Sequence, residues 1–102
     1  MTGENHHLFI NIGQNMILSY DGILGIFDLD TSTGSHLTRK FLSGMEKAGR
    51  VINVAEDIPK SFILYRKREE TIIYLSQYSS QTLYKRSQSP FFELQRADTD
   101  IE

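Results

Sequence analysis

The side chains most able to do chemistry in this 102-residue sequence are its cations, and they gather in the middle of the chain. Residues 35–86 hold ten lysines and arginines against five acids, whereas residues 1–34 have a charge balance of −4 and residues 87–102 one of −3. A basic working face suited to nucleic acid produces such a distribution. Scattered surface charge produces it too, so both interpretations stay open.

Lys60 is the first candidate phosphate contact. It follows Pro59, whose ring restricts the backbone of the turn, so the lysine is predicted to sit at a fixed place on the surface. The side chain can hold a phosphate, or it can pair with Glu56 or Asp57 nearby in sequence.

Two further groups complete the candidate set. Arg66–Arg68 is predicted at a hairpin tip beside Glu69 and Glu70, which favours a solvated turn as the alternative interpretation. The Lys85-Arg86 pair is predicted in the last turn of a closing helix, where cations stabilise the helix dipole in any protein. The candidate nucleic-acid-binding residues are therefore Lys60, Arg66, Lys67, Arg68, Lys85 and Arg86.

Other chemistries find little support in the sequence. His6-His7 are adjacent histidines near the terminus and do not define a metal site. Asp28 and Asp30 lie in a predicted polar loop, which lacks the apolar pocket that acid/base catalysis requires. The tyrosines could stack on single-stranded bases, but buried or interface positions are the commoner use. With no cysteine and no glycine-rich phosphate loop, the sequence predicts no enzyme, no cofactor, no metal and no small-molecule substrate.

An α+β fold is expected to position these groups. The hydrophobic content of 39% can build one small core, and residues 8–87 are predicted to form the domain. Strands are predicted at residues 8–12, 16–18, 23–27, 50–55, 61–66 and 71–77, giving a small, mainly antiparallel sheet of about six strands. Residues 1–7 are expected to be frayed, and residues 88–102 to form a mostly mobile acidic tail.

One central helix and one short C-terminal helix complete the prediction. Ser35 is a good N-cap for the first helix, and Gly49 can end it in the left-handed conformation. Its predicted apolar stripe consists of Leu37, Phe41, Leu42, Met45 and Ala48. Ser79 or Ser80 can cap the second helix at residues 81–86, and residues 28–34 are predicted to be a polar loop.

Three predicted strands are apolar on both faces, which is more than one helix can cover. They are centred on residues 23–27, 62–64 and 72–75. Open apolar surface of that extent usually marks a contact with a partner, so we expect the chain to associate with itself.

Several short blocks of the sequence resemble the RemA/RemB family of bacterial extracellular-matrix (biofilm) gene regulators, in particular its RemB-type members. The match covers residues 8–86 and is carried by residues 9–13, 26–28, 38–42, 49–53, 56–62 and 82–86, which read FINIG, IFD, TRKFL, GRVIN, EDIPKSF and TLYKR. The EDIPKSF block is specific to the RemB-like branch.

The resemblance implies a compact subunit similar to LytTR-type DNA-binding domains, assembled into a ring. In the RemA branch, duplex DNA is thought to follow the rim of the ring, held by arginines repeated around it. Each subunit then offers a few phosphate contacts, and the ring multiplies them along one duplex. One of those arginines falls where this chain has Gly22, and an arginine pair falls in the loop that here contains residues 57–60. Phosphate contacts are therefore expected at the candidate residues named above.

Two functions follow as hypotheses. The first is a cytoplasmic, ring-forming, DNA-binding transcriptional regulator of extracellular-matrix genes, with itself and duplex DNA as partners and no membrane contact. The second is an interaction or scaffold protein with the same ring that does not bind duplex DNA itself. Gly22 and the missing arginine pair motivate the second.

Overall fold

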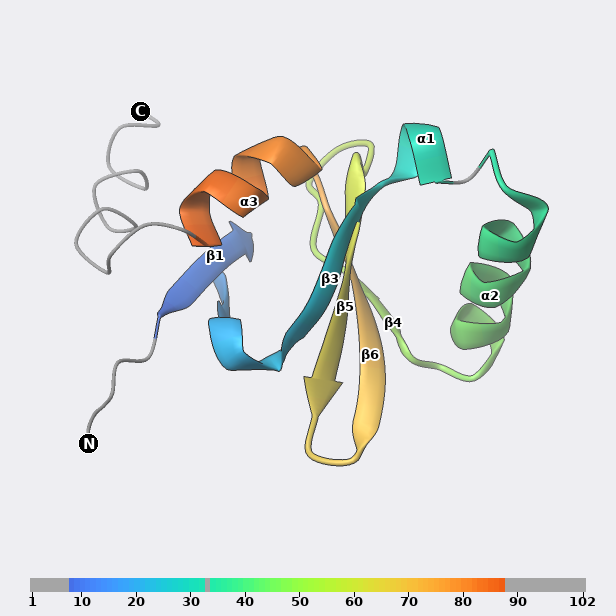
Figure 1. The fold of residues 1–102 in the computed structure, drawn as a ribbon, viewed down its shortest axis with the longest axis horizontal. Coiled ribbons are helices and arrows are strands. Elements are labelled where there is room, and N and C mark those ends of the chain that lie inside the picture. Colours follow the sequence, from blue (N-terminus) through green and yellow to red (C-terminus); the bar gives the residue numbers. More distant parts are fainter. Residues whose placement is uncertain (1–7, 33, 88–102) are drawn as a thin grey trace.

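The protein is an α+β domain built in three layers, as the computed structural model shows for residues 8–32 and 34–87 (Figure 1). A two-stranded hairpin and the helix α3 lie on one side of a four-stranded sheet, and the helix α2 lies on the other side. The elements are β1 (Phe9–Gly13), β2 (Met16–Ser19), the 3-10 turn η1 (Tyr20–Gly22), β3 (Ile23–Asp28), α1 (Leu29–Ser32), α2 (His36–Lys47), β4 (Val51–Asn53), β5 (Ser61–Lys67), β6 (Glu70–Ser76) and α3 (Ser80–Ser87).

The strands form two sheets, whereas the sequence predicted one. Strands β1 and β2 pair only with each other, and the larger sheet has the order β3-β5-β6-β4. Strand β4 runs parallel to β6, and the other pairs are antiparallel. The parallel pair arises because α2 carries the chain from β3 across to the far edge of the sheet, and a crossover of that length permits parallel pairing.

The core lies between the larger sheet and the β1-β2 hairpin with α3. Its buried members are Ile10, Ile12, Leu18, Val54, Ile63, Tyr74 and Leu83. Two buried serines join the layers: the Ser76 hydroxyl donates to the Ile12 carbonyl at 2.7 Å, and the Ser61 hydroxyl donates to the Tyr78 carbonyl at 2.7 Å. These bonds satisfy polar groups that would otherwise be costly to bury.

The helix α2 begins and ends as predicted, but it does not cover the core. The Ser35 hydroxyl accepts from the Thr38 amide, and Gly49 takes a φ of +75° beyond the last turn. No residue of α2 is buried, and the predicted apolar stripe leaves Leu37 75% exposed and Phe41 44% exposed. The stripe nevertheless faces β3 and β5, where Leu37 and Phe41 line a pocket with Phe62, while the main core cluster lies on the opposite face of the sheet.

The predicted polar loop contains a short helix, since α1 occupies Leu29–Ser32. The Leu29 amide donates to the Lys60 carbonyl at 2.9 Å, which holds the start of α1 against the end of β5. The predictions for residues 1–7 and for the tail at 88–102 lie outside the described residues. Each helix within the described ranges is too short or too polar to cross a membrane.

Only one of the three strands predicted to leave apolar surface open does so. Strands β5 and β6 are central in the sheet, and their side chains Phe62, Ile63 and Ile73 are buried. Strand β3 lies at the edge, where Leu24 is 55% exposed and Phe27 40% exposed. The expected open surface is therefore restricted to the β3 edge.

Tyr74 makes the stability of this core sensitive to alkaline pH. Burial raises the pKa of the Tyr74 phenol, and the neighbouring Tyr65 raises it further. The unfolded chain then loses this proton at lower pH than the folded one, so the stabilisation is complete below the ordinary tyrosine pKa and disappears as pH rises through the folded value. Urea unfolding at pH 8 and pH 11 is expected to show a smaller alkaline loss in Tyr74→Phe than in the parent; equal losses would contradict this.

Candidate nucleic-acid interface

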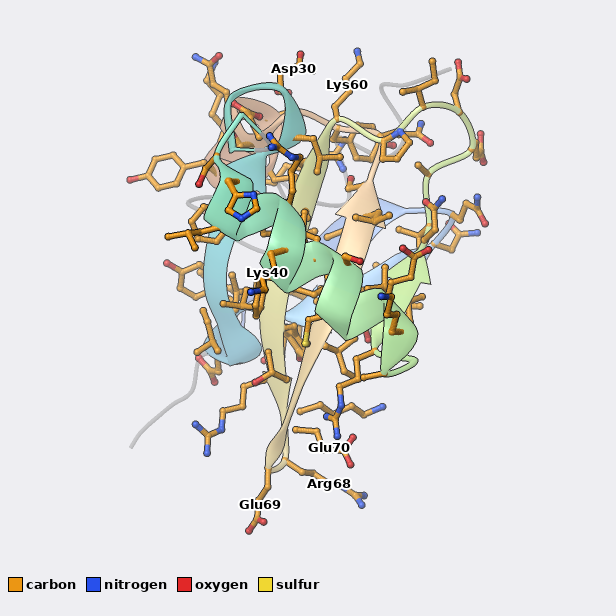
Figure 2. All side chains as sticks on the ribbon, turned by 90° about the vertical axis from the view of Figure 1, so that its right-hand side faces the viewer. Asp30, Lys40, Lys60, Arg68, Glu69 and Glu70 are labelled. Atoms are coloured by element: carbon orange, nitrogen blue, oxygen red, sulfur yellow. The ribbon has the colours of Figure 1, made fainter. Side chains whose placement is uncertain are left out.

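Lys60 has a fixed backbone and an exposed side chain. Its amide donates to the Ser76 carbonyl at 2.8 Å, and its own carbonyl accepts from Leu29, so the residue is held at the junction of β5, β6 and α1. Lys60 forms no ion pair within residues 8–32 and 34–87, which leaves the predicted pairing with Glu56 or Asp57 unrealised there. The ammonium group extends beyond the end of the sheet in Figure 2 and is accessible to an anion.

The cations Arg66–Arg68 lie at the opposite end of β5, as predicted. Arg68 takes a left-handed φ of +60° in the turn, and the Arg66 side chain donates from Nε to the Arg68 carbonyl at 3.3 Å. Glu70 lies 3.7 Å from the Arg50 guanidinium, in an exposed pair of the kind that stabilises little. Glu70 is therefore directed at Arg50 beside the tip, while Arg68 and Glu69 project from the turn in Figure 2.

Lys85 and Arg86 lie on α3, on the core side of the sheet, and they differ in their surroundings. The Arg86 guanidinium donates to the Asn11 carbonyl at 2.8 Å and lies 4.4 Å from the centroid of the Tyr78 ring. Arg86 thereby links α3 to β1, and the sequence did not predict this structural role. Lys85 is exposed.

Asp28 also has a structural task, because its carboxylate lies at the start of α3. Its Oδ1 accepts from the Ser80 amide at 3.0 Å, and the Ser79 hydroxyl accepts from the Thr82 amide at 3.1 Å. Both contacts satisfy free amides of the first helical turn. The interaction of Asp28 with Ser80 links β3 to α3 across 52 positions of sequence.

The six candidate residues are not brought together into one cluster. Strand β5 has seven residues and spans roughly 20 Å, so Lys60 and the hairpin tip lie about that distance apart. The Lys85-Arg86 pair lies on the layer opposite α2. The candidates therefore occupy three separate places on the subunit.

A fourth group of cations, on the outer face of α2, was missed as a set. His36, Arg39, Lys40, Ser43, Gly44 and Lys47 line a shallow pocket of about 510 Å³. The spacing of His36, Lys40 and Lys47 is the available signal, since residues four and seven apart return to the same side of a helix. A β-carbon on Gly44 would have no atom within 4 Å, so the backbone at this point is open to close approach. This outer face combines accessible charge with little steric obstruction.

Comparisons of the chain with protein-family models and with curated proteins find no match. Its function is therefore inferred from its own charge placement. Residues 8–87 hold ten bases against eight acids, an excess of +2, while the remaining residues are net acidic. In the view of Figure 2, Lys60 lies at the upper end of the sheet, Lys40 lies on α2 in the middle, and Arg68 lies at the hairpin tip below.

Proposed function

We propose that this chain is a DNA-binding transcriptional regulator of extracellular-matrix genes, of the RemA/RemB type, that acts as a ring-shaped homo-oligomer in the cytoplasm. The observation that carries the proposal is the column of exposed cations along the α2 side of the sheet. It consists of Lys60, Arg39, Lys40, Lys47 and Arg66–Arg68.

The length of the column suits the backbone of a duplex. A span of roughly 20 Å along the sheet corresponds to about six base pairs at 3.4 Å each. Lysines and arginines that contact phosphates neutralise charge and release counterions, which supplies affinity without reading sequence. One subunit offers too few such contacts for tight binding, and repetition around a ring multiplies them through avidity. The column supports the DNA-facing role, and the resemblance to the family supports the ring.

Titration of a fluorescent duplex at about 50 and 200 mM salt tests the proposal. The parent protein is expected to bind with a steep salt dependence, because each phosphate contact adds about 0.9 to the slope of log affinity against log salt. Lys60→Ala and Lys40→Ala are each expected to weaken binding by about tenfold or more, since every subunit in contact with DNA loses one ion contact.

Lys85→Ala is the matched comparison, because it removes the same charge from the opposite layer of the subunit. It is expected to weaken binding less than Lys60→Ala. Equal losses for the two variants would remove the α2-side column as the binding surface. Weak binding at both salt concentrations would refute the DNA-binding role.

The second candidate function, a scaffold of the same fold that does not bind duplex DNA, is favoured by one observation. A β-carbon at Gly22 would lie 2.6 Å from the Tyr65 ring and 2.9 Å from the Arg66 carbonyl. No side chain fits there, so the position of a RemA-branch arginine is closed in this chain. An oligomer with flat DNA titrations would support this candidate.

A further inference from the structure

The large exposed hydrophobic side chains of the described residues are unevenly distributed. Six of the ten surround one strand, the edge strand β3. They are Tyr20, Leu24, Phe27, Leu37, Phe41 and Tyr84. We call this set the β3-edge patch.

The β3-edge patch includes a pocket on each face of the sheet. On the core side, Tyr20, Leu24 and Tyr84 line a pocket of about 480 Å³ between β3 and α3. On the α2 side, a pocket of about 270 Å³ is lined by Phe27, Leu37 and other apolar residues of α2 and β5. The edge strand separates the two pockets, so one partner seated on the edge can fill both.

The backbone of β3 is open to pairing along this edge. Within the described residues β3 pairs only with β5, and Figure 1 looks onto its other side, with β3 in front of β5. Edge strands of soluble proteins are usually protected by a lysine, a proline or a covering element. Ile23–Asp28 contains no lysine or proline, and its one charged residue, Asp28, lies at the end and contacts α3.

The area of the patch approaches what one side of a stable interface requires. With roughly 150–250 Å² for a large side chain, the exposed fractions of the six leave roughly 600 Å² in water. The largest apolar patch of a typical monomer is about 300–600 Å², and a standard interface takes about 800 Å² from each partner. The patch therefore supplies most of the area of one side of such an interface.

We infer that the β3-edge patch binds the same patch of a second copy of this chain, with the two β3 strands antiparallel about a two-fold axis. This inference deepens the proposed homo-oligomer and rests on it. Antiparallel pairing is self-complementary here, because the apolar middles of the strands meet while the two Asp28 ends lie roughly 20 Å apart. A two-fold contact yields dimers, and a second contact is needed to join dimers into a ring.

A second copy fits the patch better than the C-terminal segment of the same chain. Residues 88–102 contain Phe91, Phe92, Leu94 and Ile101 as large apolar residues that could enter the pockets. Four such side chains on one short segment cover less than the six exposed ones on both faces of the sheet. A chain ending at Ser87 is therefore expected to keep the number of subunits of the parent oligomer, whereas a changed number of subunits would make the segment the occupant and overturn the inference.

The mass of the Leu24→Lys protein, measured by light scattering, tests the inference. A lysine at this position should cut the mass at least twofold, because each interface would then bury two unpaired charges among apolar side chains. Ile17→Lys is the matched control, since Ile17 is 47% exposed but lies on β2, away from the patch. The control is expected to keep the parent mass. Equal masses for the parent and Leu24→Lys would overturn the inference.

Cross-linking supplies a second measurement that tolerates a poorly folding variant. The chain has no cysteine, so Leu24→Cys introduces a single thiol. A short bis-maleimide should join two Cys-bearing copies through position 24, and Ile17→Cys should give no such product. Absence of the position-24 product overturns the two-fold contact. If the parent binds DNA and Leu24→Lys keeps the parent mass, only the two-fold contact is refuted. If Leu24→Lys loses mass but the parent does not bind DNA, only the role as a regulator is refuted.

Discussion

Replacing Gly22 by alanine is expected to lower the free energy of unfolding by about 1–3 kcal/mol, the usual cost of an overpacked site. The added β-carbon would lie 2.9 Å from the Arg66 carbonyl, a backbone atom that cannot move aside. Tyr65, 2.6 Å away, is held by a hydrogen bond from the Ser19 amide to its hydroxyl and by an edge-to-face contact with Tyr74. Urea unfolding monitored by circular dichroism measures the loss.

Gly44→Ala is the control for this prediction and should have the opposite sign. Gly44 lies in α2, where an added β-carbon would have no atom within 4 Å, so alanine adds helix propensity without a clash. A gain of about 0.5–1 kcal/mol is expected. Gly22→Arg should be at least as destabilising as Gly22→Ala and should fail to strengthen DNA binding. A stable Gly22→Arg protein would contradict the crowding around this glycine.

Replacing Arg86 by alanine is the second large effect that we expect. The change removes a hydrogen bond from a charged group to the Asn11 carbonyl and a cation–π contact with Tyr78. The expected loss is about 2 kcal/mol of unfolding free energy. For a domain of this size that corresponds to a fall in Tm of roughly 10 °C, measurable by a thermal melt.

Lys85→Ala separates this structural role from a simple change of charge. It removes one positive charge from the adjacent position of α3, where the side chain is exposed. Its unfolding free energy is expected to stay within about 0.5 kcal/mol of the parent value. A comparable loss in both variants would show that α3 responds to charge, and that the contacts with Asn11 and Tyr78 contribute little.

Local signals predicted most of the secondary structure. Ser35 caps α2 as expected, and the predicted hairpin between β5 and β6 turns at Arg68. The predicted start of the last helix was also close, with Ser79 accepting from the Thr82 amide. These features depend on contacts within three or four residues, so the sequence around each of them is sufficient.

The candidate interface was only partly predictable for the same physical reason. Exposure of Lys60 follows from its turn, but its separation from Arg66–Arg68 follows from the full length of β5. The contact of Arg86 with Asn11 joins residues 75 positions apart, which no local pattern reveals. The spacing of the α2 cations along the helix was visible in the sequence. That they form one exposed group follows only from the position of α2 as an outer layer of the structure.

The sequence alone determined most of the elements and the segregation of positive charge, because caps, turns, periodicity and composition are properties of neighbouring residues. Tertiary structure decided on which face of the sheet the main core cluster formed, and it left Leu37 and Phe41 of α2 and the β3 edge exposed. It also decided that β4 runs parallel to β6 and that β1 and β2 form a separate sheet. These outcomes depend on competition between distant apolar surfaces for the same buried space, which is resolved only when the whole chain packs.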